Sequence, residues 1–102
     1  MESAVDKVDG HAAGIRGRSK LLFGNADRLQ VAAAVANSPG VLHAQELSDA
    51  LGISPPRVRT QLMAFTSAGL MTRLPRNQNI QSYERNEDPF WSLALRLVEN
   101  WG

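Results

Sequence analysis

The sequence predicts a small, mainly α-helical domain that carries one β-hairpin, and three observations lead to this prediction. Two amphipathic segments between His43 and Leu70 are separated by a tight turn. Two short extended segments follow them and flank a polar, turn-forming stretch. With 102 residues the chain is long enough for one domain with a thin core, and domains of this size are often completed by dimerisation.

The composition excludes several classes of function. Hydrophobic residues make up 43% and charged residues 21% of the chain, which is ordinary for a globular protein. There is no cysteine, so disulfides, thiolate metal sites and cysteine nucleophiles are excluded. The longest apolar run, Val31 to Ala36, is too short to span a membrane, and the N-terminus lacks the apolar core of a signal peptide. We therefore expect a cytoplasmic protein with no membrane partner.

Enzymatic activity and cofactor binding have no supporting motif. The sequence contains no phosphate-binding glycine loop and no plausible histidine–carboxylate arrangement. The only histidines are His11 and His43, and His43 is better explained as the first residue of a helix. We expect neither an enzyme nor a metal or cofactor site.

The N-terminal residues 1–20 are expected to form a flexible, basic tail, and residues 21–102 to form the folded domain, with N- and C-terminal helices for dimerisation. Three basic residues of the tail are able to reach a DNA backbone as a flexible arm: Arg16, Arg18 and Lys20. Solvated charges ahead of a helix are the simpler explanation of the same residues.

A helix is predicted from Ala26 to about Asn37, because Asn25 can cap its start and small apolar side chains fall on one face. Arg28, near its start, is able to contact a phosphate, but an ion pair within the domain or simple exposure to solvent is the more ordinary explanation. Val41-Leu42 is too short for a normal strand, but two residues are able to pair with the edge of a hairpin.

The stretch from His43 to Leu70 is predicted to form two helices joined by a short turn. The first helix carries Leu47 and Leu51 on one face. Gly52 ends it, because glycine tolerates the left-handed backbone conformation that helix ends often need. The spacing of the pair is that of a helix-turn-helix, although two ordinary amphipathic helices of a bundle would show the same pattern.

The second helix of the pair is predicted over residues 55–68. Ser54 is a good N-cap, and Pro55 suits the first helical position, where no amide hydrogen is needed. Its apolar stripe consists of Val58, Leu62 and Phe65. Its opposite face carries Arg57, Arg59, Thr60, Met63 and Ala64. A helix that is apolar on one face and carries arginine on its leading turns suits the major groove of DNA.

A β-hairpin is predicted directly after this helix, with extended segments over Leu70–Leu74 and Ile80–Arg85. The residues at its tip are able to donate hydrogen bonds to phosphate or to minor-groove base edges: Arg76, Asn77, Gln78 and Asn79. A hairpin in this position, over residues 71–85, is a wing. The predicted fold is therefore a winged helix-turn-helix, in the order helix, short strand, helix, helix, two-stranded hairpin, helix.

Charge is unevenly distributed along the chain. Between Ser54 and Arg85 there are five arginines and one acidic residue, a local charge of +4, whereas the remainder has six basic and nine acidic residues, a balance of −3. Charge gathered on one segment is typical of a DNA-binding face, although a solvated surface also produces such runs.

The last helix is predicted to begin with Asp88 as N-cap and Pro89 at the first position. It is apolar around most of its circumference, whereas an ordinary surface helix has one apolar stripe roughly 100° wide. We expect a second copy of the chain to cover it across a two-fold axis, although the N-terminal segment of the same chain is an alternative. The predicted dimer interface consists of Leu21, Leu22, Phe23, Phe90, Trp91, Ala94, Leu97, Val98 and Trp101.

Several short motifs between residues 21 and 85 follow the pattern of a known family. They are Ala26-Asp27-Arg28-Leu29, Glu46-Leu47, Leu51-Gly52-Ile53-Ser54, Val58 with Leu62, Ala68-Gly69-Leu70, and Tyr83. With these residues the chain resembles the ArsR-type winged-helix repressors, with the MarR type as a near neighbour.

The resemblance implies a homodimeric transcriptional regulator that acts as a repressor on palindromic double-stranded DNA. Many family members sense metals through cysteine and histidine clusters, which this sequence does not contain. The second helix departs from the family pattern, with Arg59 in place of serine, Gln61 in place of histidine and Met63 in place of a polar or basic residue. We expect these departures to change the preferred DNA sequence, and the sequence identifies no effector.

The predicted DNA contacts lie on the helix over 55–68, which would enter the major groove, and on the wing over 71–85, which would lie on the backbone and minor groove. They are Ser54, Pro56, Arg57, Arg59, Thr60, Gln61, Arg73, Arg76, Asn77, Gln78 and Asn79. The alternative is a protein-interaction module, in which the aromatic side chains of the last helix bind another protein: Phe90, Trp91 and Trp101.

Overall fold

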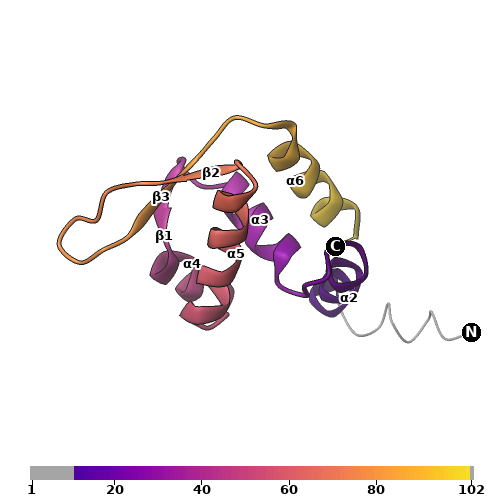
Figure 1. Ribbon diagram of the computed structural model, residues 1–102. Coiled ribbons are helices and arrows are strands. Elements are labelled where there is room, and N and C mark those ends of the chain that lie inside the picture. The colour runs from indigo at the N-terminus through magenta and orange to yellow at the C-terminus, as the bar shows by residue number, and fades with distance from the viewer. Residues whose placement is uncertain (1–10, 102) are drawn as a thin grey trace, which may run out of the picture.

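The computed structural model describes residues 11–101 and is mainly helical, with one three-stranded antiparallel sheet (Figure 1). Among the described residues, no helix is long and apolar enough to cross a membrane. The elements are α2 (His11–Phe23), α3 (Arg28–Ala36), β1 (Val41–His43), α4 (Ala44–Leu51), α5 (Pro55–Ser67), β2 (Met71–Arg73), β3 (Ser82–Arg85) and α6 (Pro89–Trp101).

Helix α3 forms the centre of the core. Leu29, Val31 and Val35 are each 0% exposed, because α2, α4, α5 and α6 all pack against this helix. The helix begins two residues later than predicted. The side chain of Asn25 accepts a hydrogen bond from the amide of Asp27 at 2.8 Å, which makes a turn before the helix rather than a cap at its first residue.

The sheet has the strand order β1-β3-β2, so the strand before the helix pair joins the outer side of the hairpin. Leu42 lies opposite Tyr83, which confirms the prediction that Val41-Leu42 pairs with the hairpin. Leu42, Tyr83 and Met71 are at most 4% exposed and turn one face of the sheet toward the core.

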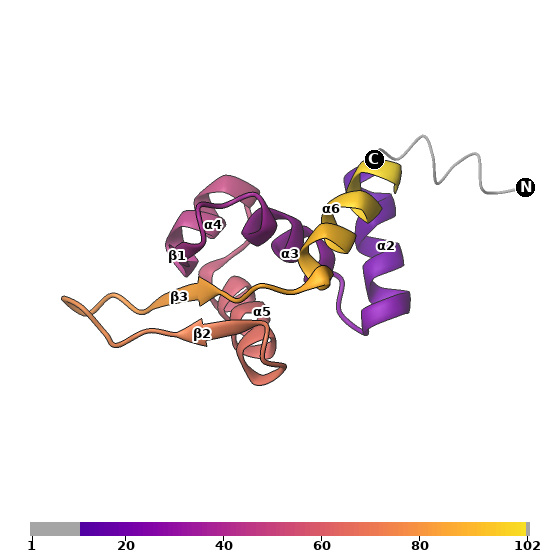
Figure 2. The same ribbon diagram turned by 90° about the horizontal axis from the view of Figure 1, so that it is seen from above.

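The hairpin closes through a two-residue turn. Asn77 and Ile80 exchange backbone hydrogen bonds of 3.1 and 2.9 Å, and Gln78 and Asn79 between them have positive φ angles of 52° and 64°. Two consecutive left-handed residues form the turn whose twist matches that of antiparallel strands. The tip extends away from the helices, at the opposite end of the molecule from α2 and α6 (Figure 2).

Replacing Gln78-Asn79 with Asn-Gly is expected to raise the free energy of unfolding by about 1 kcal/mol, because a side chain in the left-handed region costs roughly 1–2 kcal/mol and this dipeptide carries the lowest cost. Urea denaturation measures the change as a higher midpoint at unchanged slope. Asn77→Gly is the control, since the φ angle of Asn77 is not positive. A gain as large from Asn77→Gly would contradict the explanation.

The prediction of a flexible tail over residues 1–20 is wrong from residue 11 onward, and residues 1–10 lie outside the described part of the chain. Residues 11–20 belong to α2, where Ile15 is 2% and Ser19 is 0% exposed. The hydroxyl group of Ser19 donates to the carbonyl of Asn25 at 2.6 Å and accepts from the amide of Leu29 at 3.0 Å. Tertiary contacts thus stabilise a helix whose own apolar periodicity is weak.

The last helix begins as predicted, and Asp88 Oδ1 accepts a hydrogen bond from the amide of Phe90 at 2.8 Å. Trp91 and Ala94, predicted at a dimer interface, are instead 5% and 1% exposed in the core of the same chain. The rings of Phe65, Phe90 and Trp91 pack together, with centroids 5.1 to 5.9 Å apart.

Helix α2 runs alongside α6 (Figure 2). The N-terminal segment of the same chain therefore covers part of the last helix, which was the alternative to a second copy of the chain. The guanidinium group of Arg18 lies 4.8 Å from the ring centroid of Trp101. Phe23, Leu97, Val98 and Trp101 are half-buried by these contacts. The apolar side chains that remain exposed at this end are Leu21 (85%), Leu22 (62%) and Leu93 (50%).

Candidate nucleic-acid interface

The turn between α4 and α5 forms as the local sequence predicts. Gly52 has a φ angle of 69° at the end of α4, where its backbone amide donates to the carbonyl of Ser48 at 2.9 Å. Ile53 is buried in the turn, and Ser54 is extended at the N-cap position of α5. The hydroxyl group of Ser54 makes no capping hydrogen bond, so this exposed group is free for a ligand.

Helix α5 buries one side and exposes the other. Val58, Leu62 and Phe65 are at most 2% exposed, as predicted. The exposed residues in its first three turns are Pro56, Arg57, Arg59, Thr60 and Met63. The helix lies on the same side of the molecule as the hairpin and packs against β2 (Figure 2).

Gln61, predicted to contact DNA, is instead 1% exposed. Its Nε2 donates to Asn25 Oδ1 at 2.8 Å, and its Oε1 accepts from Arg28 Nε at 2.6 Å. Gln61 therefore holds α5 against Asn25 and the first residue of α3 and is not available to a base edge. The signal was in the sequence, because residues 58, 61, 62 and 65 together complete the helical spacing of one buried face.

Arg28, for which the sequence left a phosphate contact, an ion pair or solvent exposure open, forms no ion pair within the described residues. Its Nε atom is occupied by the Gln61 amide. A charged donor and a neutral acceptor at this distance form a charge-assisted hydrogen bond, which is stronger than one between neutral groups. Arg28 thus helps to fix the position of α5.

Asp27 joins three elements, a role that the sequence did not indicate. Its carboxyl group accepts from Arg57 Nε at 2.9 Å and from Arg57 Nη2 at 2.6 Å, in a two-point contact. Arg16 of α2 donates to the same carboxyl group at 2.5 Å. The Asp27 side chain is 9% exposed, whereas the side chains of Arg16 and Arg57 are 41% and 49% exposed.

The pKa of Asp27 follows from this arrangement. The hydrogen bond from Arg57 holds the pKa of the Asp27 carboxyl group below its usual value, although burial of the group acts in the opposite direction. The same hydrogen bond raises the pKa of Arg57. Asp27 is therefore ionised at neutral pH. Two of the N–H groups of Arg57 are already bound to it within the protein.

Arg85 is likewise used within the fold. Its Nη1 atom lies 2.6 to 3.1 Å from the carbonyl oxygens of Val35, Ala36 and Ser38, at the C-terminal end of α3. A cation at this end of a helix satisfies carbonyls that lack an intrahelical partner. Of the five arginines between Ser54 and Arg85, Arg57 and Arg85 are thus held by close contacts within the fold. Arg76 makes only one long, exposed hydrogen bond, 3.4 Å to the Asn79 carbonyl at the hairpin tip.

Three arginines remain available on the α5–hairpin side. Arg59, Arg73 and Arg76 are exposed and have no acidic partner among the described residues. The chain from Ser54 to Tyr83 contains no acidic residue at all. The tip residues Asn77, Gln78 and Asn79 are exposed too, so the predicted hairpin contacts all lie at the surface.

Asn86 fixes the base of the hairpin to the end of α5, and sequence reasoning missed it. Its amide donates to the Leu70 carbonyl and its Nδ2 to the Gly69 carbonyl, both at 3.0 Å. Its Oδ1 accepts from the Thr72 hydroxyl group at 2.8 Å. These bonds set how the hairpin stands relative to α5.

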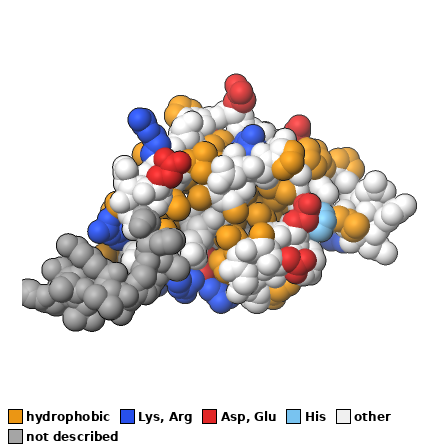
Figure 3. All heavy atoms as spheres, turned by 180° about the vertical axis from the view of Figure 1, so that it is seen from behind, with side chains coloured by type: hydrophobic (Ala, Val, Ile, Leu, Met, Phe, Trp, Pro, Cys, Tyr) orange, Lys and Arg blue, Asp and Glu red, His pale blue; other side chains and the backbone are white. Residues whose placement is uncertain are grey.

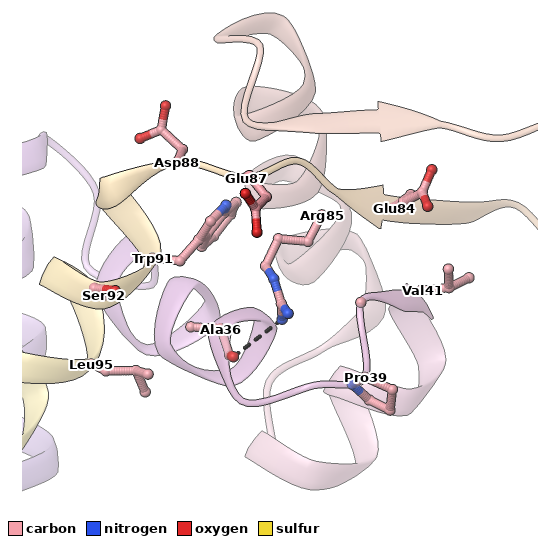
Figure 4. Close-up of a pocket in the computed structure, with 11 residues that line it drawn as sticks. Ala36, Pro39, Val41, Glu84, Arg85, Glu87, Asp88, Trp91, Ser92 and Leu95 are labelled. Atoms are coloured by element: carbon pink, nitrogen blue, oxygen red, sulfur yellow. Dashed lines mark hydrogen bonds between the residues drawn. The ribbon is translucent and has the colours of Figure 1, made fainter.

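A cavity of about 460 Å³ lies between the end of α3, strands β1 and β3, and α6 (Figure 4). The carboxyl groups of Glu84, Glu87 and Asp88 lie around it, while the Arg85 guanidinium group points to the Ala36 carbonyl. Carboxylates repel phosphate, so the acidic surroundings of the cavity do not suit a nucleic acid.

On the face opposite to that of Figure 1, hydrophobic side chains spread across the middle (Figure 3).

His43 is the N-cap of α4, and its backbone amide donates to the Glu46 carboxyl group at 2.9 Å. Within residues 11–101, no three histidine, aspartate or glutamate side chains gather as metal ligands would. Comparison with protein-family models, with curated proteins and with solved structures finds no match to this chain.

Proposed function

We propose that this chain is a sequence-specific, double-stranded-DNA-binding transcriptional repressor of the winged helix-turn-helix type. One observation carries the proposal. The exposed side of α5 and the adjoining hairpin present Arg59, Arg73 and Arg76 with no acidic residue between Ser54 and Tyr83. A surface whose cations lack acidic partners attracts a polyanion, and DNA carries one phosphate charge per roughly 1.7 Å of its axis.

In this proposal α5 enters the major groove and the hairpin follows the backbone into the neighbouring minor groove. Arg59 has five N–H donors and no partner among the described residues, which suits the two acceptors of guanine. Arg57 is restrained by Asp27 and serves a flanking phosphate. Arg76, at the tip, contacts the backbone and carries no sequence information.

The test is titration of a mixed-sequence duplex at several salt concentrations, with wild-type protein and Arg76→Ala. Wild-type affinity is expected to fall steeply as salt rises, because each phosphate contact releases counterions. Arg76→Ala is expected to weaken binding equally on all sequences and to reduce the slope of log K against log salt by about 1.

The matched control for Arg76→Ala is Arg96→Ala, since Arg96 is exposed on α6, away from the hairpin. Its salt slope is expected to equal that of the wild type. Absence of duplex binding at low salt would refute the proposed function.

The proposal includes a homodimer that binds a palindrome, with half-sites about one helical turn apart, roughly 34 Å. The support is the exposed leucine side chains at the α2–α6 end, Leu21, Leu22 and Leu93. This end lies opposite the hairpin tip (Figure 1), so two copies joined there leave both α5–hairpin sides free.

Replacing Leu21 and Leu22 with glutamate is expected to shift a dimer to monomers in sedimentation equilibrium, because charge at an apolar interface is left without a partner. Both side chains are more than half exposed, so the fold should persist. Ala50→Glu, on the exposed side of α4, is the matched control and should leave the dimer intact. A wild-type monomer at all concentrations would contradict this part of the proposal.

The alternative of a protein-interaction module loses its predicted surface. Trp91 is 5% exposed, and Phe90 and Trp101 are half-buried by contacts within the chain. Trp91 is thus closed to a partner, which could contact only the exposed parts of Phe90 and Trp101.

A further inference from the structure

Met63 stands on the exposed side of α5 and has no role in the core. It is 51% exposed, whereas the apolar residues on the other side of the same helix are at most 2% exposed. Single exposed hydrophobic residues are common, so this exposure alone gives Met63 no function. The neighbouring groups indicate which kind of ligand Met63 is able to contact.

Four residues form the outermost line of α5, at spacings of four, three and four, opposite its buried side. They are Pro56, Thr60, Met63 and Ser67, and all four are exposed. Pro56 has no amide hydrogen, and the Thr60 hydroxyl group donates to the Pro56 carbonyl at 3.0 Å. The line therefore offers methyl and methylene groups, with no free hydrogen-bond donor before Ser67.

Arginine flanks this apolar line on both sides. Arg57 is restrained by the carboxyl group of Asp27, and Arg59 has no partner among the described residues. A ligand that fits the face must place hydrogen-bond acceptors beside Arg59 and an apolar group beside Met63, and it must tolerate a surface without carboxylates. The major-groove edge of DNA has these properties.

We propose that Met63 contacts the C5-methyl group of a pyrimidine in the major groove, near the base that Arg59 reads. This inference rests on the proposed DNA-binding function. The C5-methyl group of thymine is the apolar group of the major-groove base edges, and 5-methylcytosine presents the same group. The flexible thioether side chain of methionine packs readily against such a group.

The experiment uses the duplex that the wild-type chain enriches from a random pool, with deoxyuridine replacing each thymine of a half-site in turn. This change removes the methyl group and leaves the hydrogen-bonding groups of the base unchanged. Four residues of helix rise about 6 Å, so the sensitive thymine is expected within about two base pairs of the position read by Arg59. Loss of the contact with one methyl group should weaken wild-type binding about fourfold per half-site.

Met63→Ala should bind the thymine and deoxyuridine duplexes equally, and Met63→Leu should keep the sensitivity of the wild type. Because Met63 is half exposed, both variants are expected to unfold like the wild type, which thermal denaturation checks. Cytosine and 5-methylcytosine at the same position separate the two sources of the group. If 5-methylcytosine restores the affinity that cytosine lacks, the contact is with the methyl group on either base. If only thymine restores the affinity, the contact is specific to thymine.

A half-site with no thymine within reach of Arg59 overturns the inference, as does an equal loss with deoxyuridine in the wild type and in Met63→Ala. Both results leave duplex binding itself intact. A chain that binds no duplex at low salt overturns the proposed function together with this inference, so the two failures are distinct.

Discussion

Asp27→Asn is expected to lower the free energy of unfolding by about 2–3 kcal/mol at neutral pH. The substitution keeps the size of the side chain but removes the negative charge of the carboxyl group that accepts hydrogen bonds from Arg16 and Arg57. Breaking a buried ion pair by removing one partner costs roughly 3–5 kcal/mol, and the partial exposure of both guanidinium groups reduces this figure. Urea denaturation of both proteins measures the difference.

The pH dependence of the same pair of proteins follows from the lowered pKa of Asp27. A carboxyl group whose pKa is lower in the folded chain contributes stability above its unfolded pKa, which is near 3.8. That contribution is lost as pH falls through the lower, folded pKa. The difference between wild type and Asp27→Asn should therefore be constant from about pH 5 to pH 7 and should shrink below about pH 4.

Asp49→Asn is the matched control for Asp27→Asn. Asp49 is an exposed carboxylate on α4 whose side chain accepts a hydrogen bond from Gln45, and its substitution should change stability by less than about 0.5 kcal/mol. Equal stability of Asp27→Asn and the wild type at neutral pH would show that the carboxylate does not hold α2, α3 and α5 together.

Arg59→Ala is expected to remove the preference for one base pair in each half-site and to leave stability unchanged. A two-point contact of arginine with guanine contributes roughly 1–3 kcal/mol of discrimination, or about tenfold for each 1.4 kcal/mol. Arg59 is exposed and makes no hydrogen bond to another described residue, so its loss leaves no buried group unsatisfied. Selection of bound sequences from a random duplex pool, with variant and wild type in parallel, measures the preference.

Arg57→Ala is the matched comparison, because Arg57 lies two residues away, on the opposite edge of the exposed surface of α5, and is bound to Asp27. Its loss should destabilise the fold and should weaken binding on all sequences alike. The two variants thus separate a base contact from a contact that positions α5. If Arg59→Ala kept both the affinity and the base preference of the wild type, α5 would not enter the groove in the proposed way.

The sequence by itself determined the elements whose formation depends on near neighbours. Gly52 ends α4, Pro55 begins α5 and Asp88-Pro89 begins α6, because caps and turns require particular residues at particular positions. The hairpin and its pairing with Val41-Leu42 were also predictable, since alternation and turn-forming residues mark them.

Tertiary structure decided which polar groups of these elements are free. Arg57 meets Asp27 across 30 positions of the chain, and Arg85 meets the Val35 carbonyl across 50. Gln61 meets Asn25 across 36, which turns a predicted DNA contact into a buried link. Local periodicity places Gln61 on the buried face of α5 but does not identify such distant partners. The same is true of α2, which is helical because Ile15 and Ser19 are buried, although its own pattern is weak.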